Sequence, residues 1–334
     1  MNPGPKNLLT DVPGLSVGHA DDDALMSGTT VILCDQATVA SVDVRGGGPG
    51  TRDTELLAPE MTVPGVDAIV ISGGSAYGLD AASGVQAWLR DKGRGFPVGP
   101  VTVPIVPQAI LFDLINGGNK DWGKFPPYRD FGWAACDAAG QDFAIGSVGA
   151  GLGCTTASLR GGLGSASMVT EDGFTVGAIV AVNCVGRVAM GDGPHFWAGA
   201  WEVGDEYGGY GLPPRASDEA LIPYSKLDAL SATTPALVAT DAVLTKAEAK
   251  RLAVMAQDGM PRAIHPVHTP LDGDTVFSLA TGKREMTDPV VDMMRIGAAA
   301  ARCLARAISR AVYEAGQDGR GPQKWPAYRD RFPR

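Results

Sequence analysis

The sequence predicts an α+β protein in which strands form sheets and helices lie outside them. Short apolar, β-branched runs recur between turn residues, which is the pattern of strands. The stretch 289–314 instead repeats apolar residues every three or four positions, as one face of a helix does. Glycine is abundant, with 45 among 334 residues, and its clusters beside the apolar runs indicate tight turns and close backbone approach.

The first third of the chain predicts strands followed by one helix. We expect short antiparallel strands over 15–19, 28–34 and 38–44. The glycine-rich stretch 45–52 could cradle an anion, but it lacks the Gly-Lys-Ser/Thr ending of a nucleotide loop, so a structural turn is the preferred interpretation. A buried strand over 67–72 then runs through Gly73-Gly74 into a helix expected over 79–90.

The turn between that strand and helix exposes Ser75 and Tyr77. Its sequence superficially resembles the nucleophile elbow G-x-S-x-G, yet the serine spacing fits poorly and no histidine is suitably placed. We therefore interpret Tyr77 as pocket lining at best.

The middle of the chain alternates weak and strong signals. Prolines demote 101–107 to an edge strand or extended chain, and a helix is expected near 133–139. The glycine-dense stretch 146–167 contains Gly149 and Gly151, whose amides could bind a developing oxyanion or could merely form turns. A strong strand over 174–182 ends at Asn183, whose side chain is either a turn cap or a functional amide.

Residues 190–230 show weak periodicity and are interpreted as a mobile linker. Three carboxylates in it, Asp192, Asp205 and Glu206, are compatible with a pocket for a cationic group. A solvated acidic loop is the preferred interpretation.

The stretch 231–241 is the one around which we organise the sequence, because a hydroxyl-rich start runs straight into an apolar strand. Threonines at such a position are usually ordinary strand-entry residues. Downstream, the capping box at 245–248 predicts the start of a helix. After that helix, Asp272-Gly273-Asp274 places two carboxylates on a tight turn at the start of a second strand. Carboxylates beside Thr233 could activate its weakly nucleophilic hydroxyl.

The base for that activation has to come from elsewhere. None of the four histidines is placed to serve, and they form no metal-spaced cluster: His19, His195, His265 and His268. If the Thr233 hydroxyl attacked the carbonyl of Ala232, an N-to-O acyl shift and hydrolysis would free the α-amine of Thr233. That amine, with an ordinary pKa of about 7.7–8.0, suits a general base.

Composition narrows the function class. A net charge of −9 argues against nucleic acid as a partner. Five cysteines without CxxC spacing indicate reduced, buried thiols. The start of the chain lacks a signal-peptide core and no run of about 18 apolar residues occurs, so we expect a cytoplasmic protein without a membrane span, metal or cofactor.

Several ordered motifs carry a family resemblance that covers nearly the whole chain. They lie at 7–14, 44–47, 72–79, 149–151, 161–167, 182–183, the Thr233 strand and the Asp272 turn. Through them the sequence resembles the L-aminopeptidase/D-esterase family of self-processing hydrolases, which includes DmpA, the β-peptidyl aminopeptidases and the nylon-oligomer hydrolase.

The resemblance implies a fold and an organisation. The expected fold is a four-layer αββα sandwich of the N-terminal-nucleophile hydrolase type, similar to DmpA and ornithine acetyltransferase. The chain 1–334 would be one catalytic domain, cut between Ala232 and Thr233 into fragments 1–232 and 233–334 that remain together in a homo-tetramer.

The resemblance also implies roles and departures. Thr233 would be the nucleophile, Asn183 the oxyanion amide, and Asp272 with Asp274 the groups that orient the nucleophile and its amine. Relatives carry glycine or asparagine where this chain has Ala232.

Two further departures concern the substrate. Ser158, near Arg160, replaces a lysine of the nylon-oligomer hydrolase, and Phe112 replaces its tyrosine. Ser158 and Phe112 thus join Tyr77, Gly149 and Gly151 as candidate substrate-binding or oxyanion residues.

The expected activity is that of an aminopeptidase acting on short peptides or peptide-like amides through an acyl-enzyme. An oligoamide hydrolase and an acyltransferase of similar fold are the alternatives within the enzymes. A non-enzymatic protein that binds an anion through its glycine loops is the alternative from another class.

Overall fold

The computed structural model describes residues 2–223 and 232–333. Its strands are β1 (Leu15–Asp22), β2 (Ser27–Val44), β3 (Thr51–Arg52), β4 (Val66–Ser72), β5 (Phe96–Val98), β6 (Val101–Val103), β7 (Gln108–Ile110), β8 (Leu163–Val169), β9 (Thr175–Ala181), β10 (Pro235–Ala242) and β11 (Thr275–Arg284). Its α-helices are α1 (Ala81–Asp91), α2 (Tyr128–Asp137), α3 (Asp218–Leu221), α4 (Lys246–Ala256), α5 (Pro289–Glu314) and α6 (Tyr328–Arg331).

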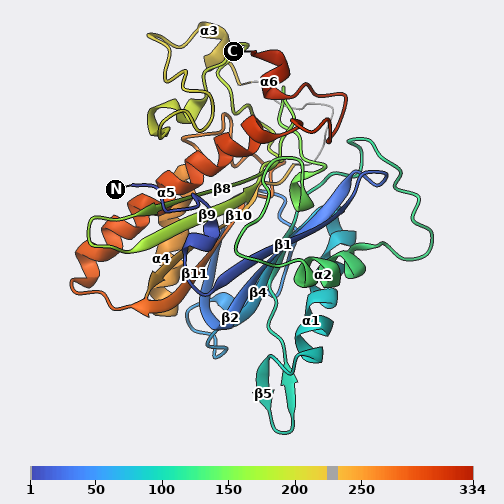
Figure 1. The fold of residues 1–334 in the computed structure, drawn as a ribbon, viewed down its shortest axis with the longest axis vertical. Coiled ribbons are helices and arrows are strands. Elements are labelled where there is room, and N and C mark those ends of the chain that lie inside the picture. The colour runs from blue at the N-terminus through green and yellow to red at the C-terminus, as the bar shows by residue number, and fades with distance from the viewer. Residues whose placement is uncertain (1, 224–231, 334) are drawn as a thin grey trace.

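Strand β2 links two halves of the sheet (Figure 1). Its first part pairs with β1 and β4, and its last part pairs antiparallel with β11. The register shifts between Leu33 and Thr38, where the exposed residues 35–37 cross from one half to the other. The separate strands expected over 28–34 and 38–44 are therefore wrong, because this segment stays extended instead of turning.

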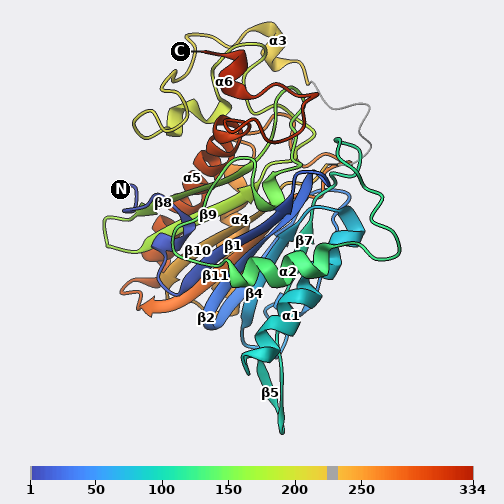
Figure 2. The same cartoon turned by 45° about the vertical axis from the view of Figure 1, so that its right-hand side comes forward.

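Alternate residues of β10 face two different cores. Ala236 and Val238 pack toward the helices α4 and α5, whereas Leu237 and Ala239 pack against the other half of the sheet. Beyond that half, a third core joins it to α1 and α2. Figure 2 shows the resulting layers, with α4 and α5 on one outer face and α1 and α2 on the other. The expected four-layer αββα sandwich is confirmed.

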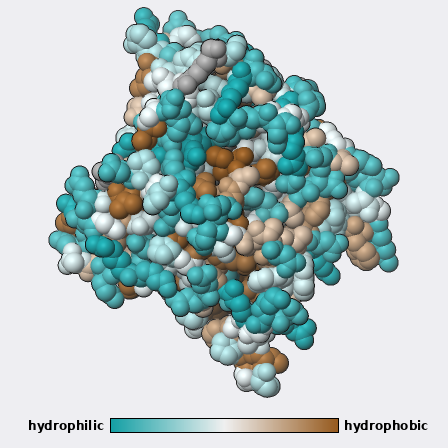
Figure 3. Space-filling model, in the orientation of Figure 1, coloured by the Kyte–Doolittle hydropathy of each residue, from teal (hydrophilic) through white to brown (hydrophobic). Residues whose placement is uncertain are grey.

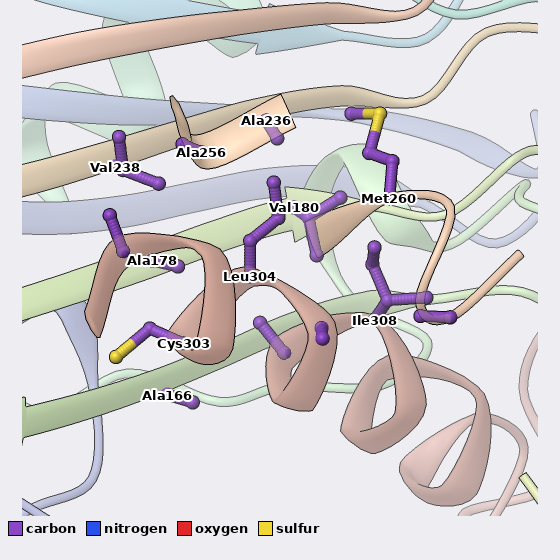
Figure 4. Close-up of a cluster of buried hydrophobic side chains, with 14 of the residues drawn as sticks. Ala166, Ala178, Val180, Ala236, Val238, Ala256, Met260, Cys303, Leu304 and Ile308 are labelled. Carbon is purple, nitrogen blue, oxygen red and sulfur yellow. The ribbon is translucent and has the colours of Figure 1, made fainter. Parts of the chain in front are cut away.

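Helix α5 has the bounds that its periodicity predicts. The Asp288 side chain caps it by accepting a hydrogen bond from the Val291 amide at 3.2 Å, and proline occupies the first turn. Leu304 and Ile308 point from α5 onto Val180 of β9 and the neighbouring strands (Figure 4). Helix α4 begins with the expected capping box, in which the Thr245 amide donates to Glu248 at 2.7 Å.

Strand β8 is an element that glycine content concealed, because the stretch 146–167 suggested only turns. A side chain at Gly164 would place its Cβ 1.9 Å from the Ala307 carbonyl oxygen of α5. The glycine is there so that the strand and the helix can approach closely.

Residues 190–223 are packed against the body, so the expected linker is wrong over this range. Phe196 and Tyr207 are buried in the core that holds α5. The remaining residues of the expected linker, 224–230, lie outside the described residues.

Glu206 is correspondingly not solvated. Its two carboxylate oxygens accept from Nε and Nη2 of Arg306, which is fully buried in α5, at 2.6 and 2.8 Å. The pair also contacts Asn7, so it joins the start of the chain to its last long helix. Burial acts to raise the pKa of Glu206, but the hydrogen bonds and charge of Arg306 outweigh it and hold the pKa below the ordinary 4.5.

Glu206→Gln is expected to destabilise the protein by about 3–5 kcal/mol, because it leaves the buried Arg306 charge uncompensated. Denaturant unfolding monitored by tryptophan fluorescence would measure the loss. Asp192→Asn is the control, since Asp192 pairs with Arg331 at the surface and should change stability by less than about 1 kcal/mol. Because the pKa of Glu206 is lowered, the wild-type advantage should be complete above pH 4.5 and disappear as pH falls through the lowered pKa. Equal stability of the two variants would contradict the buried pair's role.

The hairpin of β5 and β6 projects from the body below α1 (Figure 1). Its register places Phe96, Val98, Val101 and Val103 on one face, and all four side chains are exposed. The hairpin forms the lower tip of the surface in Figure 3, where apolar residues are visible. Within the described residues, no helix is long and apolar enough to cross a bilayer.

Candidate active site

Parallel pairing of β10 and β11 brings the threonine and the aspartates together. The two strands start at the same edge, and the pairing extends backward to a bridge between Ala232 and Asp272. The Ala232 amide donates to the Leu271 carbonyl at 3.1 Å, and the Gly273 amide donates to the Ala232 carbonyl at 2.9 Å. Thr233 is buried at this edge, with 1% of its surface exposed.

Gly273 leaves the space that the Thr233 hydroxyl occupies. A Cβ at this position would lie 2.5 Å from Thr233 Oγ1 and 2.8 Å from the Gly48 carbonyl oxygen. The hydroxyl therefore lies directly against the backbone of the turn whose amide binds the Ala232 carbonyl. The sequence pattern predicted no role for the Gly273 amide, although this residue lies between the two aspartates.

Asn183 lies on the other side of the nucleophile. Its backbone carbonyl accepts from the Thr233 amide at 3.0 Å. Its side chain is oriented from both ends, because Oδ1 accepts from the Thr155 amide at 3.1 Å and Nδ2 donates to the Phe112 carbonyl at 2.8 Å. Phe112 thus reaches the site through its backbone, and the loss of a tyrosine hydroxyl there does not remove this contact.

Asp272 is buried and accepts three hydrogen bonds. Its Oδ1 accepts from the Val185 amide at 3.1 Å, and its Oδ2 accepts from the Thr269 amide and hydroxyl at 2.9 and 2.8 Å. Burial, followed by the negative charge of Asp274, raises the pKa of Asp272 above its ordinary 3.8. The carboxylate is therefore rigidly held but more basic than a solvated aspartate.

Asp274 connects the nucleophile's strand to a histidine. Its Oδ1 accepts from the Thr234 amide at 3.2 Å, and its Oδ2 accepts from the His268 amide and Nδ1 at 3.0 and 2.9 Å. The expectation that none of the histidines is well placed is wrong for His268. The signal was its position six residues before Asp274, on the loop that leads into the same turn.

The glycine loop after β2 is a structural turn, as preferred from sequence. The Arg45 and Gly46 amides donate to the Asp274 carbonyl, Gly47 donates to Thr269, and Gly48 donates to Asp272. These amides support the aspartate turn and are not directed at an anion.

Gly149 and Gly151 have partners other than Thr233. The Gly149 amide donates to the Asp21 carboxylate at 2.5 Å, and the Gly151 amide donates to the Val148 carbonyl at 2.8 Å. Neither amide is available to an oxyanion in this conformation, so we do not assign them that role.

Ser158 lies on the loop that carries Thr155, and its amide donates to Thr156 Oγ1 at 3.4 Å. The nearby Arg160 does not replace the missing lysine as a substrate cation. Its guanidinium is buried and binds the C-terminal segment through the Arg320, Pro322 and Trp325 carbonyls.

Tyr77 is exposed in the turn before α1 and lines a cleft of about 500 Å³. The lining consists of Thr51, Arg52, Ala76, Tyr77, Leu79, Asp80 and Pro126. It includes none of the residues described above around Thr233.

The groups around Thr233 suit one kind of chemistry. Five groups meet at one sheet edge. They are the Thr233 hydroxyl, the Gly273 amide bound to the Ala232 carbonyl, the Asn183 side-chain amide, and the carboxylates of Asp272 and Asp274. Among residues 2–223 and 232–333, no group of three or more histidine, cysteine or acidic side chains could hold a metal ion. The group suits acyl transfer from an amide to a hydroxyl.

Comparisons with known proteins agree with this chemistry. The sequence model of peptidase family S58 matches residues 7–323 of the chain. The uncharacterized aminopeptidase Rv1333 of Mycobacterium tuberculosis is 43% identical over 351 residues, which cover 98% of each chain. The 6-aminohexanoate-oligomer endohydrolase of Kocuria is 28% identical and aligns with 85% of this chain and 77% of its own.

The fold has a solved counterpart. The L-aminopeptidase D-Ala-esterase/amidase of Ochrobactrum anthropi superposes with a TM-score of 0.71 at 21% identity, covering 94% of this chain and 87% of its own. That structure is described as a variant of the N-terminal-nucleophile hydrolase fold.

Proposed function

The chain belongs to peptidase family S58, and we propose that it is a self-processing aminopeptidase whose nucleophile is Thr233. The observation that carries the proposal is the contact between the Gly273 amide and the Ala232 carbonyl, with the Thr233 hydroxyl against the same glycine. A peptide carbonyl that accepts a hydrogen bond beside a hydroxyl is prepared for attack.

Self-processing follows from these positions. Thr233 Oγ1 would attack the Ala232 carbonyl carbon while its proton passes to the departing amine. Negative charge would develop on the Ala232 oxygen, 2.9 Å from the Gly273 amide nitrogen. The C–N bond then breaks, an ester forms on Oγ1, and water hydrolyses it to the Ala232 carboxylate and a free Thr233 hydroxyl and amine. The products would be fragments 1–232 and 233–334.

Turnover would reuse the same groups. The freed α-amine of Thr233 takes the hydroxyl proton as the hydroxyl attacks the substrate carbonyl, and it then donates a proton to the leaving amine. Asn183 Nδ2 carries two hydrogens, of which one is donated to the Phe112 carbonyl, and it would turn the other to the oxyanion. The aspartates would orient the amine through their contacts with the turn and with Thr234. Water completes the cycle by hydrolysing the acyl-enzyme.

The substrate is proposed to carry a free amino terminus, as the aminopeptidase names of the relatives suggest. The ion pairs of Asp192 with Arg331 and of Glu206 with Arg306 remove these two carboxylates from the candidates that could bind the ammonium. A charged ammonium bound against other acceptors should contribute on the order of tenfold to a hundredfold in kcat/KM.

We therefore expect an alanyl or β-alanyl anilide to be cleaved at least about tenfold faster than its N-acetylated analogue. Release of the aniline, followed by absorbance with purified protein, measures both rates. Thr233→Ala protein serves as the blank, because contaminating peptidases would act in it too. Equal rates for the two compounds would reject the aminopeptidase.

An oligoamide hydrolase that cuts within a chain is the second candidate. It is favoured by the 28% identity to the Kocuria endohydrolase. The acetylated compound decides between the two, since an endohydrolase needs no free amine.

The assembly and location remain proposals. The uncovered apolar face of the β5–β6 hairpin supports association between copies of the chain. The homo-tetramer and the cytoplasmic location stay predictions.

A further inference from the structure

His268 contacts the site, yet the mechanism above gives it no task. Its ring is largely buried, with 19% of the side chain exposed, and Nδ1 lies 2.9 Å from Asp274 Oδ2. Its backbone amide donates to the same oxygen at 3.0 Å. His268 also has a φ of 55°, a left-handed conformation that most side chains avoid. The loop therefore holds the residue in an uncommon conformation in which ring and amide converge on one carboxylate oxygen.

The surroundings of the ring indicate which nitrogen carries the proton. Asp274 otherwise accepts hydrogen bonds from amides, as an ionised carboxylate does, so Nδ1 must donate to it. The other nitrogen, Nε2, is buried and has no hydrogen-bond partner among the described residues. The geometry therefore places a proton on Nδ1, the nitrogen that faces the carboxylate.

We propose that His268 is a positioning residue for the reaction of Thr233, acting through Asp274. The ring fixes Oδ2 of Asp274, which leaves Oδ1 directed at the Thr234 amide, one residue from the nucleophile. This inference rests on the proposed function, because it assigns His268 a part in orienting the amine that processing would free.

Few charged groups compete for this carboxylate. Asp272 lies on the same turn and is itself an acceptor, bound by the Val185 and Thr269 amides. Arg45 contacts residue 274 only through its backbone amide, since its guanidinium binds Asp43 at 2.8 Å. Among the described residues, His268 is therefore the one whose side chain donates to Asp274.

Two amide substitutions separate positioning from packing. In His268→Asn, the side-chain amide nitrogen takes nearly the place of Nδ1, and asparagine tolerates a positive φ. In His268→Gln, the amide takes the place of Nε2 and the contact with Asp274 is lost. We expect His268→Gln to lower kcat about tenfold or more with KM unchanged, and His268→Asn to restore most of that loss.

The pH profile adds a readout that a packing role would not move. Without the Nδ1 donor, Asp274 is held less firmly beside the strand that carries the Thr233 amine, so the acid limb of kcat in His268→Gln should shift from its wild-type position. In His268→Asn the limb should return toward its wild-type position. Unchanged kcat and acid limb in His268→Gln would overturn the proposal, and so would equal losses in both variants.

A measurement on the unsubstituted protein covers the case in which a variant does not fold. Nitrogen-15 NMR of the imidazoles, of which the chain has four, should show His268 protonated on Nδ1. A ring protonated on Nε2 alone would overturn the proposal. Neither result bears on the proposed function, which the cleavage site and the substrate comparison test separately.

Discussion

Thr233→Ala is expected to yield one intact chain without hydrolase activity, whereas the wild-type protein should separate under denaturing conditions into fragments 1–232 and 233–334. The reason is that the hydroxyl is both the nucleophile of processing and, once the amine is free, the nucleophile of turnover. Intact-mass measurement identifies the cut, and N-terminal sequencing of the small fragment should begin Thr-Thr-Pro-Ala. The expected loss of activity is complete within detection.

Thr234→Val is the matched control for this substitution. The hydroxyl of Thr234 is buried one residue away and has no hydrogen-bond partner among the described residues, so its removal should not block the cut. Cleavage that persists in Thr233→Ala would eliminate Thr233 as the nucleophile. Loss of cleavage in both variants would indicate that the strand start, and not one hydroxyl, was damaged.

Much of the site was predictable because its parts lie at strand ends. The chain order of strand, capped helix and strand over β10, α4 and β11 is the pattern of a parallel crossover, which places both strand starts at one edge. Hydroxyl and carboxylates at those starts therefore had to meet. Helix α5 was predictable in full, since its apolar period, its cap and its proline all agree.

Other features depended on contacts that no local pattern encodes. Glu206 and Arg306 are 100 residues apart, and each looks like an ordinary surface charge in its own segment. Strand β8 has glycine at position 164 because α5 packs against its backbone there, a requirement set by a helix more than a hundred residues later. The loop 268–274 returns the His268 ring to Asp274, and closeness in sequence indicated only that the two residues share a loop and not that the side chains meet.

Asp272→Asn and Asp274→Asn are each expected to lower kcat at least about a hundredfold, the scale of a positioned acid–base partner. The side-chain NH2 of the introduced asparagine would face N–H groups that donate to the carboxylate in the wild-type protein. These donors are the Val185 and Thr269 amides at residue 272, and the Thr234 amide and the His268 ring at residue 274. Asp258→Asn, an exposed change on the same fragment, is the control. Because either variant can also slow processing, the cut fraction is first measured by mass and kcat is expressed per cut molecule.

Both kcat and stability should depend on pH through the ionisation of Asp272. Burial and the charge of Asp274 raise its pKa, so its ionised form is complete only at a pH well above 3.8, and the acid limb of kcat should lie above that value. A raised pKa means that the protonated carboxyl is favoured in the folded state. Its contribution to stability is therefore present below the ordinary pKa and is lost as pH rises through the raised one. Below the acid limb that the Thr233 α-amine sets, activity should fall a second time as Asp272 becomes protonated, and Asp272→Asn should abolish this second fall together with the stability change. Wild-type turnover per cut molecule in both variants, with the acid limb in place, would reduce the aspartate turn to a structural element.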